Sequence, residues 1–253
     1  MRLAEKVSVI TGAAQGLGAA IAKRFGEEGA FVFICDSREE EGRSVAAEIN
    51  ASSHGPERAE FLLLDVRLED SWKRVLGSVK QRCGGLDILV NNAGVNIRKE
   101  IEGMSTEELD AMLAVNIRGP FLGIKYAIPL MRKSGGGCIL NMSSICGLIG
   151  HRYTNEAYTM TKGAITLLSR SIAVRYAGEN IRCNSVHPST VDTPLVRTVL
   201  QDPMRKAERL GEVPLGRLAT VADVANAFVF LASDEAAFIT GIAFPVDGGL
   251  TAS

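Results

Sequence analysis

Short apolar segments rich in β-branched residues alternate along this chain with longer segments in which apolar residues recur at helical spacing. Proline and glycine punctuate the connections, and no Ser- or Gly-rich linker or internal repeat divides the sequence. Strands that alternate with helices form a parallel sheet with helices on both faces. The pattern therefore predicts a doubly wound α/β fold in a single domain, residues 1–253. The predicted strands are Val7–Thr11, Phe31–Asp36, Phe61–Val66, Leu86–Asn91, Cys138–Met142, Ile181–His187 and Ala243–Val246.

Two of the predicted helices begin with a capping signal. Ser105 can cap a helical region over Thr106–Met131, and the side chain of Glu108 can reach back to the cap. The segment Thr220–Asp223 shows a weaker form of the same device. Both signals place a helix start directly after a loop.

The composition limits the expected partners. The chain has a net charge of -1, with 46% hydrophobic and 23% charged residues, so no long-range field draws it to nucleic acid or to an anionic membrane. No apolar segment approaches the ~18 residues that a membrane span needs, and no signal sequence follows Met1. A small molecule is the expected partner.

The positions of the cysteines and histidines indicate the cellular compartment and argue against a catalytic metal. The five cysteines form no C-x-x-C pair and mostly lie in apolar segments, as small hydrophobic residues do. This usage is typical of a reducing cytoplasm. The three histidines are scattered, and no set of His, Cys and carboxylate residues has metal-ligand spacing. The sequence predicts a cytoplasmic protein without a catalytic metal.

Glycines cluster directly after the first predicted strand and lead into a predicted helix over Ala19–Gly29. Glycines at such a turn let the backbone approach a pyrophosphate, which then lies at the positive end of the helix. The loop is a candidate dinucleotide site, and a tight turn that serves packing alone is the alternative. Its residues are Thr11, Gly12, Ala13, Ala14, Gln15, Gly16, Leu17 and Gly18.

An acidic residue, Asp36, ends the second predicted strand. A carboxylate at that place accepts hydrogen bonds from both ribose hydroxyls and repels a 2′-phosphate. Arg38 could reach such a phosphate, but no basic residue lies within Gly12–Gly18 to help it. The pattern favours NAD over NADP; the alternative is a solvated carboxylate at a strand end.

A tyrosine and a lysine, Tyr158 and Lys162, are four residues apart in a segment of helical period. Residues at this spacing share one helix face. A free tyrosine has a pKa of about 10, and a neighbouring cation lowers that pKa toward neutral pH, where the phenol can act as a base. The pair is a candidate acid/base, although a Tyr and a Lys at this spacing also occur together by chance.

Six motifs occur together along the chain, namely Thr11-Gly12-x-x-x-Gly16-x-Gly18, Asn91-Asn92-Ala93-Gly94, Asn116, Ser144, Tyr158-x-x-x-Lys162 and Pro188-x-x-x-x-Thr193. In these motifs and in their order, over Val7–Gly249, the sequence resembles the short-chain dehydrogenase/reductase family. The resemblance implies a three-layer Rossmann fold with a seven-stranded parallel sheet, and a homotetramer or less often a dimer.

The resemblance also implies four catalytic roles. Tyr158 becomes the general acid/base, and Lys162 additionally holds the ribose of the nicotinamide. Ser144 binds the substrate oxygen; its neighbour Ser143 is the alternative, because serine at a strand end often only completes a turn. Asn116 bends its helix and holds a water that links Lys162 to solvent.

Further positions are implied as cofactor contacts. Asp65 and Val66 contact the adenine, and Asn92 contacts the neighbouring ribose, within a segment whose Ala93 and Gly94 support both the sheet and the cofactor. In the same family Val191 and Thr193 fix the nicotinamide carboxamide. These two sets complete the list of expected cofactor residues.

The sequence departs from the family pattern at two places beside the expected substrate. Ser189 replaces the glycine that commonly follows Pro188, which places a hydroxyl near the substrate. Ser144 and Tyr158 are fourteen residues apart where thirteen is common, so the loop over Gly150–Glu156 is expected to be one residue longer. Neither change removes a catalytic group.

The substrate itself is not identified by the sequence. A stretch at about residues 194–215 has weak helical period and is predicted to be a flap that closes over the substrate. Arg98 and Arg152 suggest an anionic or strongly polar substrate, and solvated surface arginines are the favoured alternative. His187 is interpreted as a packed strand-end residue. Other expected pocket residues are Val95, Asn96, His151, Tyr153 and Leu195.

These patterns predict an NAD-dependent oxidoreductase that acts on the CH-OH group and interconverts a secondary alcohol and a ketone. Two alternatives are considered. Enoyl reduction usually accompanies a wider spacing of tyrosine and lysine than the four residues found here. A catalytically silent dinucleotide-binding sensor or scaffold typically lacks the tyrosine or the lysine, and here all four catalytic positions are filled.

Overall fold

A parallel sheet forms the centre of the structure, a computed structural model that describes residues 1–53, 55–193, 196 and 201–252. Its seven strands are arranged in the order β3-β2-β1-β4-β5-β6-β7. This order reverses between β1 and β4, as in a Rossmann fold, and confirms the predicted fold class. The strands are β1 (Val7–Thr11), β2 (Phe31–Asp36), β3 (Ala59–Leu63), β4 (Ile88–Asn91), β5 (Gly137–Met142), β6 (Ile181–Pro188) and β7 (Ala243–Val246).

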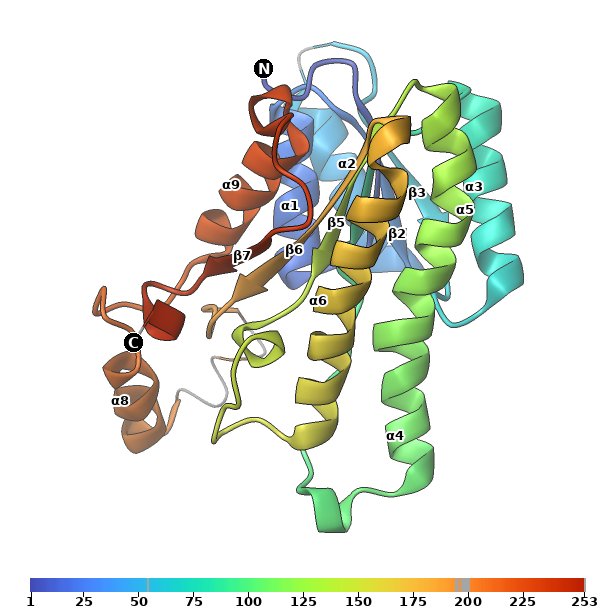
Figure 1. Cartoon of the computed structure of the whole chain (residues 1–253). Helices are drawn as coiled ribbons and strands as arrows, with labels where there is room; N and C mark the ends of the chain where they lie inside the picture. The colour runs from blue at the N-terminus through green and yellow to red at the C-terminus, as the bar shows by residue number, and fades with distance from the viewer. Residues whose placement is uncertain (54, 194–195, 197–200, 253) are drawn as a thin grey trace.

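Helices cover both faces of this sheet and make three layers (Figure 1). One face is covered by α1 (Gly16–Glu27), α2 (Glu39–Ser52) and α9 (Val221–Ala232). The other is covered by α3 (Glu69–Cys83), α5 (Gly119–Lys133) and α6 (Glu156–Tyr176), with α4 (Thr106–Leu113) continuing into α5. The remaining elements are α8 (Pro203–Gly211), the short helices η1 (Ile101–Gly103), η3 (Ile145–Gly147), η4 (Ala177–Glu179), η6 (Asp234–Ala236) and η7 (Leu250–Ala252), and the π-helical turn η2 (Ala114–Arg118).

Each face has its own hydrophobic core. Phe25 and Phe228 are fully buried between α1, α9 and the sheet, and Trp72 is fully buried on the opposite face. A buried side chain of this size stabilises the fold by roughly 1.5–3 kcal/mol. Within the described ranges, no helix is both long and apolar enough to cross a membrane.

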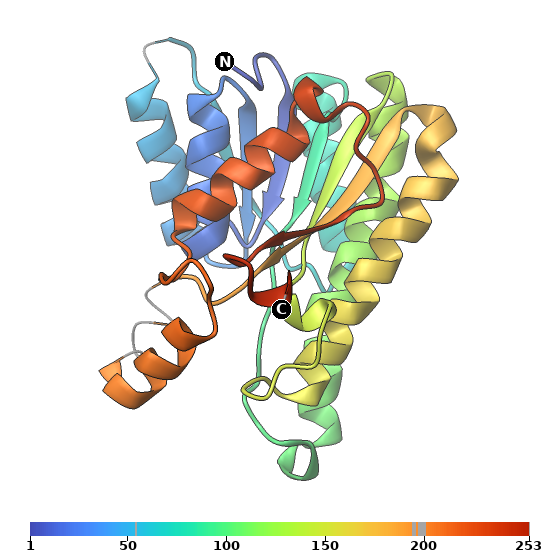
Figure 2. The ribbon, with the colours of Figure 1, turned by 60° about the vertical axis from the view of Figure 1, so that its left-hand side comes forward.

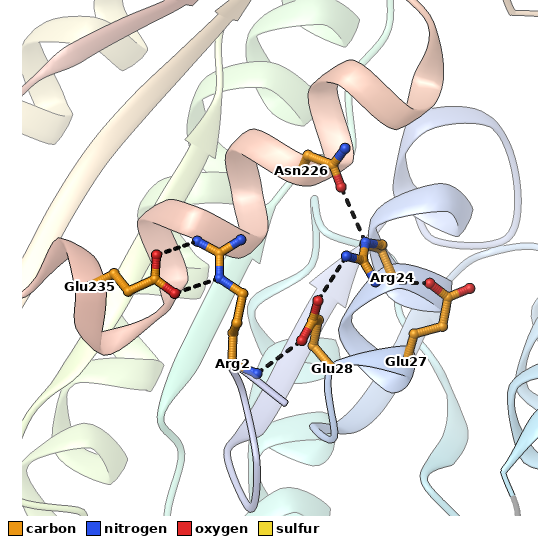
Figure 3. Close-up of polar contacts among 6 residues, drawn as sticks. All are labelled: Arg2, Arg24, Glu27, Glu28, Asn226 and Glu235. Atoms are coloured by element: carbon orange, nitrogen blue, oxygen red, sulfur yellow. Dashed lines mark hydrogen bonds and ion pairs between the residues drawn. The ribbon is translucent and has the colours of Figure 1, made fainter.

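A polar network ties the start of the chain to α1 and α9 (Figure 3). Arg2 makes two hydrogen bonds to the Glu235 carboxylate, at 2.7 and 2.8 Å, and its backbone N–H donates to Glu28 at 2.9 Å. Arg24 of α1 pairs with Glu28 at 2.7 Å and donates to Asn226 of α9 at 3.1 Å. These contacts fasten three segments that are distant in sequence along one edge of the helical layer.

Several predicted element boundaries were wrong by a few residues. The third strand ends at Leu63 and not at Val66, because its partner β2 ends at Asp36, which pairs with Leu63. The fourth begins at Ile88 and not at Leu86. The first helix begins at Gly16, three residues earlier than predicted, so that the last glycines of the loop form its first turn.

Both capping signals are confirmed. Ser105 accepts a hydrogen bond from the Glu108 backbone and the Glu108 side chain binds back, and Thr220 and Asp223 make the same reciprocal pair. The signal at Thr220 is therefore a complete capping box and not a weaker version. Reciprocal bonds of this kind satisfy backbone N–H groups that a helix start otherwise leaves free.

Replacement of glycine by alanine is expected to have opposite effects on stability at two helical glycines, and this difference tests the packing. A Cβ at Gly42 of α2 would lie 2.3 Å from the Phe61 ring, whereas a Cβ at Gly77 of α3 would meet nothing within 4 Å. We predict that Gly42→Ala lowers the free energy of unfolding by about 1–3 kcal/mol and that Gly77→Ala raises it by about 0.5–1 kcal/mol. Urea denaturation measures both, and a stabilising Gly42→Ala would contradict the packing between α2 and β3.

Candidate active site

The candidate site lies where the carboxyl ends of the central strands meet. Figure 2 shows the strands pointing to the edge of the sheet near α8 and the start of α6. The loops after β1, β4, β5 and β6 lie at this edge and carry many of the predicted site residues. Tyr158 and Lys162 lie on α6, Asn116 lies in η2, and the others are at or after the ends of β2 and β3. Ligands of doubly wound folds bind at this edge, at the point where the strand order reverses.

The glycines of the first loop have two different functions. A Cβ at Gly12 would lie 2.8 Å from Ala93 Cα, and one at Gly18 would lie 2.1 Å from the Gly12 oxygen, so both glycines are required for close packing. Gly16 instead has a φ of +56° and faces open space. The packing alternative therefore explains two of the three glycines, and Gly16 remains next to free space.

Thr11 and Asn92 hold this loop against the segment after β4. The Thr11 hydroxyl accepts hydrogen bonds from the backbone of Asn92 and Ala93, both at 3.0 Å, and donates to Val90. The Asn92 side-chain nitrogen donates to the carbonyls of Thr11 and Gly12 at 2.9 and 3.0 Å. Both of its hydrogens are thus engaged by the loop, so this amide supports the glycine turn. Its predicted contact with a ribose remains a prediction.

The N-terminus of α1 is open to an anion. Gln15 is the N-cap residue and makes no side-chain cap, and the first turn, which contains Leu17, has no acidic residue. The backbone N–H groups of a first turn carry positive partial charge and lack partners inside the helix. Together with the open space beyond Gly16, this helix end fits the pyrophosphate of a dinucleotide.

Asp36 lies at the end of β2 and is turned toward the same loop. Its carboxylate accepts hydrogen bonds from the backbone of Ala14 and Arg38, both at 3.0 Å. The Arg38 guanidinium is 3.7 Å away, and the Asp36 side chain is only 9% exposed. The carboxylate is therefore held in place beside the glycine loop, which is unlike the solvated strand-end residue of the alternative interpretation.

The two predicted adenine contacts have internal partners. Arg67 pairs with the Asp65 carboxylate at 2.7 Å and holds the pKa of that carboxyl below its usual range. The Val66 oxygen accepts a hydrogen bond from the Trp72 indole at 3.0 Å, and Val66 packs against Gly119. Both residues follow β3, next to the strand that carries Asp36, and their contact with an adenine remains a prediction.

Asn116 lies in the π-helical turn η2 and clamps the loop after β4. Its side chain accepts from the Val95 N–H and donates to the Val95 oxygen, both at 2.9 Å, and donates to Thr161 at 3.1 Å. The predicted helix distortion at Asn116 is present. The amide nitrogen is fully engaged, so a water held by this residue would need another atom. A Cβ at Gly94 would lie 3.5 Å from Asn116 Oδ1.

Lys162 is buried at the centre of these elements. Its Nζ donates to the Met142 oxygen at the end of β5 at 2.8 Å and lies 5.4 Å from the centre of the Tyr158 ring. A Cβ at Gly94 would lie 3.6 Å from Nζ. Burial lowers the pKa of the Lys162 ammonium to about 8, because a charge is poorly solvated in the interior.

The pKa of the Tyr158 phenol differs from the sequence expectation. Burial raises it above its ordinary value, while the Ser144 hydroxyl and the charge of Arg98 act in the lowering direction. The neighbouring Lys162 ammonium is not sufficient to reverse this effect in the chain alone. The prediction that a cation beside the ring brings the pKa of the phenol toward neutral pH is not met in the chain alone, because desolvation outweighs the nearby charges.

The two adjacent serines face in different directions. Ser143 is buried, and its hydroxyl donates to the Lys162 oxygen at 3.0 Å. Ser144 interacts with the Tyr158 phenol, and its hydroxyl accepts from the Cys146 N–H at 3.3 Å. The geometry thus favours Ser144 as the substrate-facing serine, as the family resemblance implies.

His187 supports Ser144 from behind, a function that the sequence did not indicate. Its Nδ1 lies 2.7 Å from the Ser144 carbonyl oxygen, which can only accept, so Nδ1 carries the hydrogen. Its Nε2 then accepts from the Ser185 hydroxyl at 2.8 Å. The ring is fully buried, and burial lowers its pKa. The interpretation of His187 as a packed strand-end residue agrees with this environment.

The segment after β6 brings three further predicted residues to the same edge. Val191 is buried and forms a parallel bridge with Ala219, and the Thr193 oxygen accepts from the Val196 N–H at 2.9 Å. The buried Ser189 hydroxyl oxygen has no hydrogen-bond partner in the described part of the chain. The geometry leaves the carboxamide contacts of Val191 and Thr193 as predictions.

The expected flap lies partly outside the described residues, namely at 194–195 and 197–200, which include Leu195. Its later part, α8 and Glu212, contacts the loop before α6. His151 Nε2 lies 3.4 Å from the Glu212 carboxylate, and the Arg209 guanidinium lies 4.2 Å from the centre of the Tyr153 ring. Figure 1 shows α8 near this loop, away from the sheet. The loop over Gly150–Glu156, which is expected to be one residue longer than usual, thus contacts the later part of the predicted flap.

Asn155 is a second residue whose function the sequence reasoning missed. Its side chain caps α6 by accepting from the Tyr158 N–H at 2.8 Å and donates to Asn96 and Ile97 at 2.7 and 3.2 Å. An Asn three residues before Tyr158 is a recognisable helix-start signal. Its second contact, with the loop after β4, has no local signature.

The geometry first defines a class of protein. A sheet of this order, with an uncapped helix N-terminus after a glycine turn at the reversal point, is a dinucleotide-binding Rossmann fold. A family model described as Enoyl-(Acyl carrier protein) reductase matches residues 12–251. The chain belongs to the short-chain dehydrogenase/reductase family, whose dehydrogenases bind a nicotinamide dinucleotide.

Similar proteins of known activity span the whole chain. The trans-4-hydroxycyclohexanecarboxylate dehydrogenase of Sinomonas cyclohexanicum is 41% identical over 254 residues, which are 99% of this chain and 95% of that protein. The cyclopentanol dehydrogenase of Comamonas sp. (strain NCIMB 9872) is 40% identical over 252 residues, 100% of this chain and 99% of that one. A crystal structure of a gluconate 5-dehydrogenase from Burkholderia cenocepacia J2315, in complex with NADP and tartrate, has a TM-score of 0.93 at 28% identity and covers 100% and 97% of the two chains. These likenesses confirm the predicted family.

Because the Lys162 ammonium is buried, its removal is expected to raise the free energy of unfolding. The pKa of the Lys162 amine is about 10.5 in the unfolded chain and about 8 in the folded chain. At pH 7 the protonated amine is therefore more stable in the unfolded chain than in the folded one. We predict that Lys162→Met raises the free energy of unfolding at pH 7 by about 1–2 kcal/mol, because the full cost of the lowered pKa, about 3 kcal/mol, is partly offset by the lost hydrogen bond to the Met142 oxygen. The gain shrinks as the pH rises from about 8 to 10.5. Urea denaturation at several pH values measures this, with the exposed Lys80→Met as control. An equally stable or less stable Lys162→Met would contradict the burial argument.

Proposed function

We propose that this protein is an NAD(H)-dependent oxidoreductase that interconverts a secondary alcohol and a ketone, with Tyr158 as the general acid/base. The observation that supports this most strongly is the meeting of the Tyr158 phenol, the Ser144 hydroxyl and the buried Lys162 ammonium at one edge of the sheet. A bound nicotinamide would supply the hydride acceptor or donor, and its oxidised ring is positively charged.

Ser144 and Tyr158 act on the substrate oxygen. Loss of hydride from the carbinol carbon requires that the hydroxyl proton leaves, and in the reverse direction negative charge develops on the ketone oxygen. The Tyr158 phenolate takes the proton or the phenol returns it, and the Ser144 hydroxyl donates to the same oxygen. His187 keeps the Ser144 backbone in place through a hydrogen bond of 2.7 Å.

Lys162 and the positively charged ring of a bound oxidised nicotinamide would together supply the charge that makes the phenolate accessible. Burial alone raises the pKa of Tyr158, so acid/base function at neutral pH requires positive charge close to the ring. The Lys162 ammonium lies 5.4 Å from the ring centre. Since its own pKa is about 8, Lys162 also exchanges protons readily near neutral pH, which suits a residue that passes the proton on toward solvent. Asn116 positions the loop that covers it.

The cofactor is proposed to be NAD. Asp36 is held by Ala14 beside the glycine loop, where its carboxylate would meet a 2′-phosphate. The proposed contacts are the N-terminus of α1 for the pyrophosphate, Asp65, Val66 and Asn92 for the adenosine, and Val191 and Thr193 for the carboxamide. The gluconate 5-dehydrogenase structure contains NADP, so the preference of this chain is a separate question that depends on Asp36 and Arg38.

The proposed substrate is a secondary alcohol on a ring. The two similar dehydrogenases are named for cyclopentanol and for a hydroxylated cyclohexanecarboxylate. Enoyl reduction, the description of the matching family model, is not preferred because the tyrosine and lysine here are four residues apart. A silent sensor remains the alternative outcome of the tests below.

A homotetramer in the cytoplasm is proposed as the working form. Met160, Leu167 and Val174 follow one another at intervals of seven on α6 and are exposed, and Phe121 of α5 is exposed as well. Apolar side chains in such a row are typical of helix faces that pack against another subunit. The five cysteines are free, which suits a reducing compartment.

Tyr158→Phe tests the proposed chemistry directly. Removal of the phenolic proton carrier is expected to lower kcat by roughly 100- to 10,000-fold, whereas quenching of NADH fluorescence still reports cofactor binding. Tyr176→Phe, at the other end of α6, is the matched control and should remain active. Turnover that survives Tyr158→Phe would contradict the mechanism. NADH binding by the wild type without turnover of any alcohol or ketone would favour the sensor.

Asp36→Asn tests the cofactor preference. The substitution keeps the shape of the side chain and removes its charge, so we expect the ratio of kcat/KM for NAD over NADP to fall by about 100-fold. Glu41→Gln is the matched control, because Glu41 lies at the same distance of 3.7 Å from the Arg38 side chain but on the helix beyond the strand. A wild-type enzyme that prefers NADP would refute the interpretation of Asp36.

A further inference from the structure

The loop after β4, residues 95–98, is fixed beside Tyr158 by two asparagines. Asn116 bonds both backbone groups of Val95 at 2.9 Å. Asn155 donates to two oxygen atoms of the same loop at 2.7 and 3.2 Å, and it also caps the helix that carries Tyr158. The loop and the proposed acid/base therefore share one anchor, so the backbone that leads into Arg98 has a defined place relative to Tyr158.

Arg98 ends this loop and has an uncommitted guanidinium. It is exposed, and in the described ranges it has neither a carboxylate nor a hydrogen-bond acceptor as partner. The next residue, Lys99, is paired with Glu108 at 2.5 Å. The charge of Arg98 nevertheless reaches the site, because it lowers the pKa of the Tyr158 phenol. Arg98 is thus close enough to the phenol for its charge to act there.

Two other arginines lie near the site. Arg209 lies 3.4 Å from the Glu212 carboxylate and 4.2 Å from the centre of the Tyr153 ring, so it has a counter-charge. Arg152 lies over the same ring at 5.1 Å, a contact that uses the face of the guanidinium and leaves its N–H donors free. Arg98 differs from both because its loop is held to the helix of Tyr158 by Asn155 and because its charge acts on the phenol.

We propose that Arg98 binds a carboxylate of the substrate, so that this site prefers a hydroxy acid or an oxo acid whose carboxylate lies beyond the carbinol carbon. The planar guanidinium matches a carboxylate with two parallel hydrogen bonds. The fixed loop lowers the entropy cost of that pairing, because the backbone of the donor is already ordered. This inference rests on the proposed alcohol dehydrogenase function and specifies its substrate class.

Two ring alcohols of similar size provide the test. The probes are trans-4-hydroxycyclohexanecarboxylate and the neutral trans-4-methylcyclohexanol, each oxidised with NAD and compared by kcat/KM. The wild type should prefer the carboxylate, and Arg98→Leu should lose roughly 10- to 100-fold on the carboxylate, the usual value of a hydrogen bond to a charged group, with a much smaller change on the neutral alcohol. Arg98→Lys keeps the charge and should recover part of the loss. Exposed Arg74→Leu of α3 is the control and should change neither rate.

A second readout does not require turnover of the acid. Cyclohexanecarboxylate should inhibit oxidation of the neutral alcohol more strongly than cyclohexanecarboxamide does, and Arg98→Leu should remove the difference. An equal loss on both alcohols, with a shifted pH profile, would overturn the inference and assign Arg98 to the acidity of Tyr158. No loss on either would overturn it as well. A wild type that oxidises neither alcohol contradicts the proposed function itself, whereas oxidation of both without a preference that depends on Arg98 contradicts only the substrate class.

Discussion

The buried ammonium of Lys162 is the constraint on which the rest of the site depends. A charge that is taken out of water is costly, and the lowering of its pKa to about 8 expresses that cost. The chain offsets part of it with one bond from Nζ to the Met142 oxygen at 2.8 Å. The small residue Gly94 leaves room above Nζ, and the π-helical turn at Asn116 clamps the loop that contains it. A site of this kind gives up stability in order to place a proton-exchanging group beside a phenol.

Most of the other site residues hold the reacting groups in position. Ser143 supports the backbone of Lys162, which leaves Ser144 to face the substrate, and His187 fixes Ser144 from the opposite side. Asn155 binds the helix of Tyr158 to the loop that ends in Arg98. The positive charges of Lys162 and Arg98 thus lie on elements that are fastened to each other. An anionic substrate and a phenolate both suit such surroundings.

The sequence predicted the fold well, because alternating strands and helices constrain a parallel sheet strongly, and it named the residues that meet at the site. The local sequence pattern could not predict features that depend on contacts between residues distant in sequence. The end of β3 is set by the end of β2 at Asp36, and two loop glycines are required by Ala93 and by the loop itself. The direction of the Tyr158 pKa depends on burial, which spacing does not reveal. Arg98 and Arg152 look alike in the sequence, and only their surroundings in the fold distinguish them. Arg152 lies over the Tyr153 ring, whereas Arg98 ends the loop that Asn155 holds to the helix of Tyr158.

The most direct test of this account is the titration of the Lys162 amine itself. In ligand-free protein labelled with ¹³C-lysine, the ε-carbon resonance of Lys162 is identified by its absence from the Lys162→Met spectrum and followed against pH. We expect a midpoint of about 8, well below the ordinary value of 10.5. Titration at about 10.5, together with the exposed lysines, would show that the ammonium is well solvated and would contradict the central claim.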